Sequence, residues 1–176
     1  MRRRVGIFLA VSLGVGTLTS CTVPSGGVFG MMGDGTAVVQ MCDGHIDGAT
    51  LYLPDPNPPE LGEPKDEIIG RWTADPAVSG FSQFSVTEGG PGWQRNGRLK
   101  PRDPAKRYTL YGWSDDNNWS AMGVDFTLDE LAKLKPGELV AMSTDDPPAE
   151  EDAPEPPNRI WTLSEFKAKA CEVYIR

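Results

Sequence analysis

The sequence predicts a mainly β domain, an antiparallel β-sandwich with one short helix near residues 127–135. Short runs of β-forming residues recur along the chain, separated by glycine, proline, aspartate and asparagine, as in all-β domains. Two aromatic-rich runs flank a polar turn in YGWSDDNNWSAMG, which is the pattern of a β-hairpin. One strong helix signal stands between two of these runs.

The first twenty residues have the pattern of an export signal rather than of a folded element. Arginines occupy positions 2–4, and residues 5–18 are apolar or small throughout. This apolar stretch is shorter than the roughly 20 residues that a membrane-spanning helix needs. It ends in Leu18-Thr19-Ser20-Cys21, whereas ordinary signals end in small residues of the A-x-A kind.

The tetrapeptide LTSC resembles the lipobox of bacterial lipoproteins, and the whole chain resembles uncharacterised surface lipoproteins of actinobacteria. In the lipoprotein family a diacylglyceryl group, with acyl chains such as palmitate, is attached to the cysteine sulfur, and cleavage makes that cysteine the first residue. The resemblance implies a signal peptide over 1–20, lipidation of Cys21 and anchoring on the outer face of the cell membrane. Two or more acyl chains anchor stably, since each buried CH₂ contributes about 0.8 kcal/mol. The alternative is a plain secreted protein.

After Cys21, glycine and serine predict a flexible tether over residues 21–36, followed by a single folded domain over 37–176. About 140 residues are enough for one domain with its own core. Removal of the signal takes away three arginines and no acids, so the formal net charge changes from −8 to −11. That charge argues against general nucleic-acid binding and suits an aqueous extracytoplasmic space.

The predicted strands are defined by their β-forming residues and by the breakers between them. In chain order they are 37–42, 49–53, 68–73, 81–86, 107–113, 119–126, 138–142, 159–163 and 171–175. Three stretches rich in proline or glycine, 54–64, 89–107 and 143–158, are predicted to be loops because they cannot form central strands.

The predicted helix begins with a capping box, Thr127 at the N-cap and Glu130 at N3. Leucines follow at helical spacing, and Pro136-Gly137 ends the helix. A second capping box at Thr162 and Glu165 precedes FKAKA, where an alternating pattern also fits a strand, so both structures remain open there.

Two cysteines remain once Cys21 is assigned, one near each end of the domain. In an exported protein, Cys42 and Cys171 are expected to form a disulfide. In the chain-entropy model, a disulfide that closes so long a loop stabilises the folded domain by roughly 4–5 kcal/mol. A metal-binding pair and two free thiols are the alternatives, the first without extra ligands nearby.

A disulfide between an early and a late strand, together with the turn LAKLKPGEL before a late strand, resembles the immunoglobulin-like architecture. Trp72 lies between Cys42 and Cys171 in the cysteine–tryptophan–cysteine order, but the spacing is too long for an antibody-type domain. The resemblance implies a sandwich and carries no activity.

His45 is the only histidine, and Asp43, His45 and Asp47 would share one face of an extended strand, as a zinc site requires. Val39 and Met41 are also odd-numbered, however, and alternate residues of a strand share a face. A single strand would therefore place these core residues on the same face as the polar ones. A histidine in a surface turn is therefore expected, with no metal and no cofactor. Any hydrolytic triad would also need His45 as its base, but no G-x-S-x-G, P-loop, Rossmann or zincin motif is present.

Acids and amides lie between two tryptophans in the predicted hairpin. Asp115 and Asp116 beside Trp113 and Trp119 provide the hydrogen-bonding groups and aromatic faces that sugar binding uses. The EF-hand spacing for calcium is absent. The competing interpretation is structural, because aspartate and asparagine favour turns and tryptophans flanking a hairpin pack across the sheet.

A basic segment follows Trp93 in this acidic chain. Its members are Arg95, Arg98, Lys100, Arg102, Lys106 and Arg107. This segment could bind an anionic envelope polymer, a lipid headgroup or an acidic protein, pair with the acids of 145–155, or remain solvated. The proline-rich acidic stretch 143–158 is expected to be an exposed connection, with a docking segment as the alternative.

These observations predict a non-catalytic, membrane-anchored surface lipoprotein that recognises or assembles with a protein or another component of the cell envelope. The alternative is a carbohydrate or anionic-polymer binder, and a hydrolase using His45 comes third. The membrane and an envelope protein or polymer are the expected partners, and nucleic acid is not. The candidate contact residues are Trp93, Arg98, Lys100, Arg102, Trp113, Asp115, Asp116 and Trp119.

Overall fold

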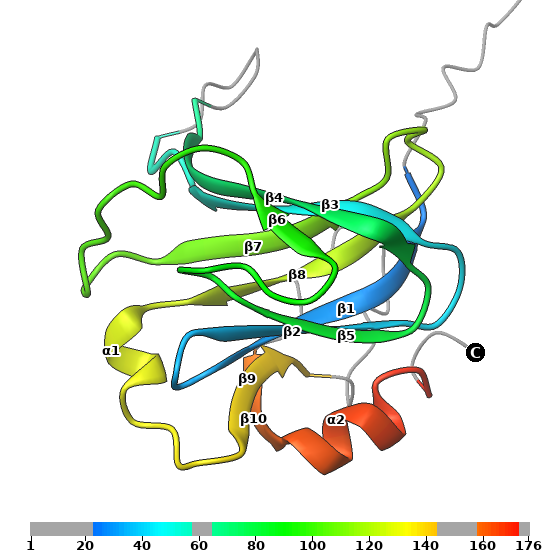
Figure 1. Cartoon of the computed structure of the whole chain (residues 1–176). Coiled ribbons are helices and arrows are strands. Elements are labelled where there is room, and N and C mark those ends of the chain that lie inside the picture. The colour runs from blue at the N-terminus through cyan, green and yellow to red at the C-terminus, as the bar shows by residue number, and fades with distance from the viewer. Residues whose placement is uncertain (1–22, 58–64, 144–157, 173–176) are drawn as a thin grey trace, which may run out of the picture.

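The structure, a computed structural model, describes residues 23–57, 65–143 and 158–172 (Figure 1). Its strands are β1 (Ser25–Met32), β2 (Thr36–Met41), β3 (Ile46–Leu53), β4 (Glu67–Val78), β5 (Phe81–Ser85), β6 (Trp93–Arg95), β7 (Tyr108–Trp113), β8 (Ser120–Phe126), β9 (Glu138–Met142) and β10 (Asn158–Thr162). The helices are α1 (Leu128–Leu131) and α2 (Leu163–Lys169). Cys21, the acidic stretch 144–157 and most of the predicted strand 171–175 lie outside the described residues.

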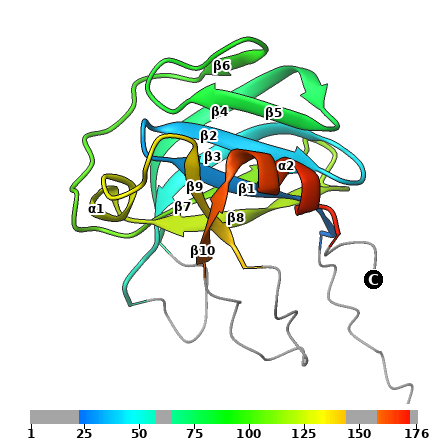
Figure 2. The ribbon, with the colours of Figure 1, turned by 90° about the horizontal axis from the view of Figure 1, so that it is seen from below.

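The mainly β fold is confirmed, but its sheet differs from the expected antiparallel sandwich. All ten described strands belong to one sheet, with the order β10-β9-β1-β8-β7-β3-β4-β6, while β2 pairs with β1 and β5. Strand β1 pairs with β8 in parallel, and the other strand pairs are antiparallel. The sheet therefore curls into a nearly closed, barrel-like form and does not separate into two facing antiparallel sheets of the immunoglobulin kind (Figures 1 and 2).

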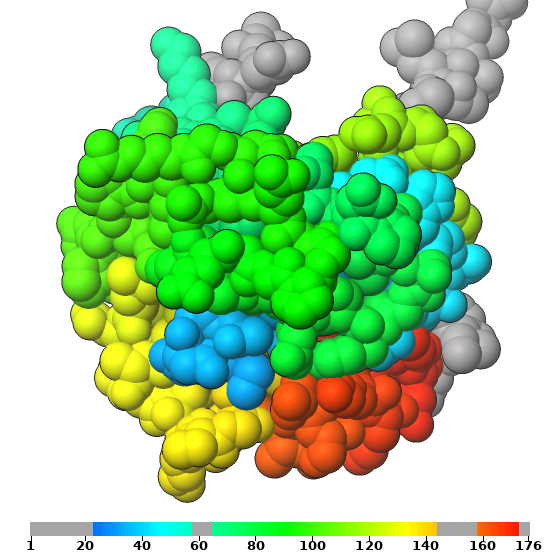
Figure 3. Space-filling model, in the orientation of Figure 1, coloured from blue at the N-terminus to red at the C-terminus, as the bar shows by residue number. Residues whose placement is uncertain are grey.

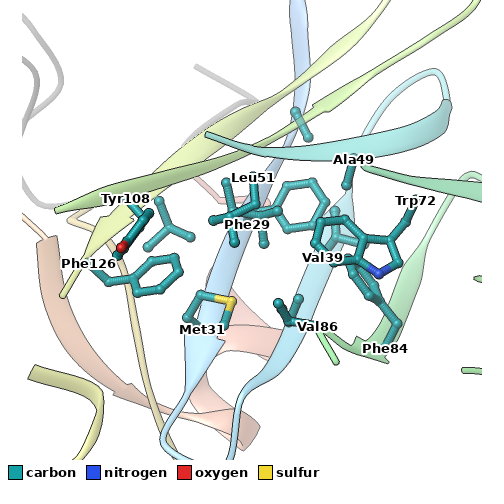
Figure 4. Close-up of a cluster of buried hydrophobic side chains, with 14 of the residues drawn as sticks. Phe29, Met31, Val39, Ala49, Leu51, Trp72, Phe84, Val86, Tyr108 and Phe126 are labelled. Atoms are coloured by element: carbon teal, nitrogen blue, oxygen red, sulfur yellow. The ribbon is translucent and has the colours of Figure 1, made fainter. Parts of the chain in front are cut away.

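The core lies inside the curled sheet, because alternate residues of each strand point inward. Phe29 and Met31 of β1 are fully buried, among Leu51, Trp72 and Phe126 from other strands (Figure 4). Closure of the sheet gives these side chains neighbours on all sides, and each buried large apolar side chain contributes roughly 1.5–3 kcal/mol.

A second apolar cluster covers the outer side of β1 and β2. Val28 and Val38 point away from the barrel interior and pack with Trp161 of β10, Phe166 of α2 and the C-cap residue Ala170. Helix α2 lies across this part of the sheet, as the view from below shows (Figure 2). The second capping box therefore begins a helix, with the Thr162 hydroxyl accepting from the Glu165 N–H.

The first capping box is also confirmed. Thr127 accepts from the N–H of Glu130, and the Glu130 carboxylate accepts from the N–H of Thr127. Helix α1 is only four residues long, shorter than the predicted 127–135, because the chain turns after Leu131 toward β9.

The predicted tether over 21–36 is wrong for most of its length. Residues 25–32 form β1, which pairs with β2, β8 and β9 and has six consecutive buried residues. The glycines suggested flexibility, but they allow close packing instead. A β-carbon at Gly30 would lie 2.6 Å from Cδ1 of Leu139, and one at Gly26 would lie 2.2 Å from the carbonyl oxygen of Asp43.

The predicted disulfide between Cys42 and Cys171 is present, with a Cα–Cα distance of 5.3 Å and a sequence separation of 129 residues. It joins the end of β2 to the turn after α2, and so fixes α2 against the sheet.

Candidate functional site

Trp93 is a core residue rather than a surface contact. It is 4% exposed and stacks on Phe84 with 4.2 Å between ring centroids. Its Nε1 donates to the hydroxyl of Ser82 at 2.8 Å. These contacts leave no face of the indole for a ligand, so Trp93 does not form part of a binding surface.

The two hairpin tryptophans lie on different surfaces. Trp113 is half-buried on the outer face of β7, and its Nε1 donates to Thr50 Oγ1 at 3.0 Å. Trp119 packs over the backbone of Gly44 and Gly26, where added β-carbons would lie 2.2 and 2.9 Å from its ring atoms. Its backbone exchanges hydrogen bonds with Ser114. Trp119 therefore connects the β7–β8 turn to the start of β1.

His45 and the hairpin acids meet at one end of the barrel. His45 Nε2 lies 3.5 Å from Oδ2 of Asp47, and the same oxygen accepts the backbone N–H of Asp115 at 2.9 Å. The N–H and side chain of Asn118 donate to Asp116, and the backbone bond is the main cause that lowers the pKa of that carboxyl. These bonds are those of a tight polar turn. Within the described ranges, no group of three or more His, Cys, Asp or Glu side chains is placed to hold a metal ion.

The basic segment is drawn in green in Figures 1 and 3, and its cationic side chains make separate local contacts. Arg95 donates to the backbone carbonyls of Thr87 and Gly97. Lys100 pairs with Glu67 at 3.0 Å, and Arg107 pairs with Glu130 at 2.7 Å. Arg102 is half-buried, and this burial lowers the pKa of its guanidinium. Arg98 and Lys106 are exposed. The segment's charge is thus distributed over several local contacts.

A more pronounced hollow lies elsewhere, in a groove between β8 and the β9–β10 pair. Strand β1 pairs with β8 only as far as Met122 and with β9 from Gly30 onward, so β8 and β9 diverge from a common neighbour. The resulting groove has a volume of about 550 Å³. We call this the β8–β10 groove; its lining residues are Arg107, Gly123, Asp125, Glu130, Lys133, Leu134, Val140, Met142, Asn158, Arg159 and Ile160.

The β8–β10 groove combines an apolar floor, cationic walls and a strand edge. Residues 124–126 of β8 pair with β7 on one side, and among the described residues no strand pairs with them on the other. Asn158 bridges the gap by donating to the backbone carbonyl of Asp125. Arg159 lies over the ring of Trp161 at 3.6 Å, and Ile160, 63% exposed, stands at the rim.

The charges in the groove are not equally available to a ligand. Glu130 is occupied by Arg107 and by the N–H of Thr127, and Asp125 accepts from the Thr109 hydroxyl. No carboxylate of the described residues lies within ion-pair distance of Lys133. Among the described lining residues, Arg107, Lys133 and Arg159 outnumber Asp125 and Glu130, so this part of the lining is net positive in a chain whose net charge is −8.

A second surface feature is a row of aromatic residues on the outer face of β3 and β7. Tyr52 and Tyr111 contact edge to face, with ring centroids 5.6 Å apart, and Trp113 follows Tyr111 on the same face. Burial raises the pKa of the Tyr52 phenol. A shallow hollow of about 330 Å³, with Thr50 and Arg71 among its lining residues, lies beside these tyrosines.

Comparison with known proteins identified no relative of this chain. No protein-family model, curated protein or solved structure matches the chain. Neither helix in the described part has the length and apolar character needed to span a membrane.

Sequence reasoning missed both the groove and the aromatic row. The groove residues come from β8, α1, β9 and β10, and nothing in the local sequence indicates that these elements meet. The alternation Thr109, Tyr111, Trp113 in β7 was a usable signal for the row, since alternate residues of a strand share a face.

Proposed function

We propose that this chain is a lipid-anchored, non-catalytic recognition module of the bacterial cell envelope. Its β8–β10 groove binds an extended, acidic polypeptide segment of an envelope protein. The observation that carries the proposal is the edge of β8 at residues 124–126, which no other described strand pairs with on the groove side and where the described lining is net positive.

The anchoring part of the proposal is supported by the LTSC sequence after an export signal and by the disulfide. Cys42 and Cys171 form an intramolecular disulfide, and such bonds persist mainly in oxidising compartments outside the cytoplasm. Lipidation of Cys21 would then hold the domain on the outer face of the membrane.

The binding part of the proposal follows from strand chemistry. An extended peptide can add to an exposed strand edge, where backbone hydrogen bonds supply affinity and side-chain pockets supply specificity. Leu134, Val140 and Met142 offer apolar contacts for every second side chain of such a peptide. Lys133 can then face a carboxylate on an intervening position.

Photo-cross-linking in intact cells tests the location of binding. A benzophenone amino acid replaces Ile160, at the rim of the groove, and as a matched control replaces Ile68, which is 40% exposed on β4 and does not line the groove. The expected result is an adduct from position 160 that is absent from position 68. Equal adducts from both positions, or none from position 160, would contradict the proposal.

A charge reversal tests the chemistry of the same adduct. Lys133→Glu places a negative charge in the groove, whereas Lys135→Glu, two residues later, lies outside the lining. The adduct at position 160 is expected to fall at least several-fold with Lys133→Glu and to persist with Lys135→Glu. Equal effects of the two reversals would mean that groove charge does not select the partner.

A defined probe tests strand addition directly. A peptide of alternating glutamate and valine is titrated into the labelled domain, with an alternating lysine–valine peptide as control. The amide resonances of Gly123 and Asp125 should shift with the acidic peptide alone. Shifts with both peptides, or with neither, would argue against the proposed ligand class.

A carbohydrate-binding module is the second candidate function, and the row formed by Tyr52, Tyr111 and Trp113 is the observation that favours it. Aromatic faces beside hydroxyl and guanidinium donors suit sugar rings. A thermal-shift panel with cell-wall glycans tests this, since ligand at 100 times its Kd stabilises by about 2.7 kcal/mol. The shift should be lost in Tyr111→Ala, and a flat panel with the native chain would exclude this function for those glycans.

A further inference from the structure

The β1 strand begins very close to the cysteine proposed as the lipid anchor. Only Thr22, Val23 and Pro24 separate Cys21 from the first residue of β1. Three residues of fully extended chain reach about 11 Å, so Cys21 lies within that distance of Pro24. The long tether that the sequence suggested is therefore absent between the anchor and the domain.

Several contacts fix the start of β1 to its surroundings. The carbonyl of Pro24 accepts the backbone N–H of Ser120 at 2.9 Å and its hydroxyl at 3.2 Å. The carbonyl of Gly26 accepts the N–H groups of Cys42 and Asp43 at 2.7 and 3.0 Å. The chain is thus held on both sides where it enters β1, by β8 on one side and by the end of β2 on the other.

These contacts define one end of the barrel, which we call the entry end: Val23–Ser25, the β7–β8 turn at 114–119 and the β2–β3 turn at 42–45. In Figure 1 the β7–β8 turn and the start of β1 lie together at the upper right, while α1 lies at the lower left. Strands β1 and β8 both run from the entry end toward α1. The eight residues of β1 span about 23 Å, so the β8–β10 groove and the α1–β9 turn lie at the far end.

We infer that the entry end is held against the lipid headgroup surface, and that the α1 end with its groove faces away from the membrane. This inference rests on the proposed lipidation of Cys21. The interaction surface comprises the exposed residues around Val23, Asp43, Asp115 and Asp116, and its partner is the headgroup layer of the anchoring membrane.

The short connection to the lipid anchor, rather than electrostatic attraction, holds the entry end against the headgroups. The exposed carboxylates of Asp43, Asp115 and Asp116 repel anionic headgroups, with a range limited to about 8–10 Å by physiological salt. Because the connection is short, this repulsion cannot move the entry end far from the surface. The β7–β8 turn at 114–119 is thus screened from large envelope polymers, whereas the distal groove stays accessible.

Fluorescence quenching in vesicles tests the orientation. The full lipidated chain, purified from a bacterium that processes lipoproteins, is placed in phosphatidylcholine vesicles containing a nitroxide-headgroup lipid. A dye is attached to Asp115→Cys at the entry end or to Lys135→Cys in the far turn, where the native lysine side chain is 82% exposed. Several-fold stronger quenching at position 115 than at position 135 is expected.

The control restores a tether. An insertion of about 20 glycine and serine residues between Val23 and Pro24 has a root-mean-square span near 25 Å, comparable with the length of the barrel. It should make quenching at the two positions nearly equal. Equal quenching in the uninserted, vesicle-bound chain would overturn the inference while leaving lipidation intact. Failure of the chain to float with vesicles, or the same flotation of Cys21→Ala, would instead overturn lipidation and the inference with it.

Discussion

The indole ring of Trp119 lies directly on the backbone of Gly44, so closely that a β-carbon at Gly44 would be 2.2 Å from Cδ2 of the ring. Gly44 also has a φ of +61°, a conformation that side-chain-bearing residues rarely adopt. Trp119 in turn contacts Gly26, so one ring joins the β2–β3 turn, the β7–β8 turn and the start of β1. The entry end of the barrel depends on this contact.

Gly44→Ala is therefore expected to destabilise the domain by about 2–4 kcal/mol, from backbone strain and displacement of Trp119 together. Gly35→Ala is the matched control, because Gly35 has a φ of +82° but no atom within 4 Å of the added carbon. The control should cost only about 1 kcal/mol. Urea unfolding of both variants measures the difference, and equal losses would mean that the Trp119 contact contributes nothing.

Removal of β1 is expected to prevent folding. A chain of residues 37–176, the boundary that the sequence alone suggests, lacks buried Val28, Phe29 and Met31, whose burial is worth roughly 6 kcal/mol in total. It also leaves edges of β2, β8 and β9 unpaired. Since domains are stable by only about 5–15 kcal/mol, no cooperative thermal transition is expected, whereas a chain beginning at Thr22 should show one. A cooperative transition in 37–176 would contradict the role given to β1.

The disulfide should contribute strongly to stability. In the chain-entropy model, a loop of 129 residues corresponds to about 5 kcal/mol at 25 °C. The double variant Cys42→Ser with Cys171→Ser is expected to lose about this much in urea unfolding. Reducing agent should cause the same loss in the native chain and none in the variant. A loss in the variant alone would point to an effect of the serines rather than of the missing bond.

The sequence predicted those elements whose signals are local. Both capping boxes, at Thr127 and Thr162, exist as hydrogen-bonded pairs, and most strands after residue 36 lie within a few residues of their predicted bounds. Strand β6, within the predicted loop 89–107, was missed because it has only three residues. The disulfide was predicted from the expected export of the chain and from the two cysteines that remain besides Cys21.

What the sequence did not predict depends on contacts between distant segments. The glycines of β1 indicate flexibility when read locally, yet Gly26 and Gly30 permit close approach of neighbouring backbone and of Leu139. The parallel pairing of Ser25 with Ser120, 95 residues apart, joins β1 to β8 within the sheet and has no local signature. The β8–β10 groove is a consequence of that pairing, because it exists only where β8 and β9 diverge along β1.

Glu130 links the capping of α1 to one wall of the groove, and its effect on stability should depend on pH. Partial burial raises the pKa of its carboxyl, but the N–H of Thr127 and the guanidinium of Arg107 outweigh burial, so the net pKa is lowered. A lowered folded-state pKa stabilises the domain above the ordinary glutamate pKa of about 4.3, and this contribution is lost as the pH falls through the folded value.

Glu130→Gln keeps an oxygen that can accept the Thr127 N–H but removes the charge, whereas Glu130→Ala removes both. At pH 7 the glutamine variant should lose only a few tenths of a kcal/mol, because the side chains of Glu130 and Arg107 are 44% and 51% exposed and solvent screens the pair. The alanine variant should lose about 1 kcal/mol. Urea unfolding between pH 7 and pH 3 measures the free energy of unfolding of each chain. The difference between the native chain and Glu130→Gln should disappear below pH 4. The difference between the native chain and Glu130→Ala should remain in part. If the native chain is still more stable than Glu130→Gln at pH 3, the shape of the Glu130 side chain, rather than its charge, makes it stabilising.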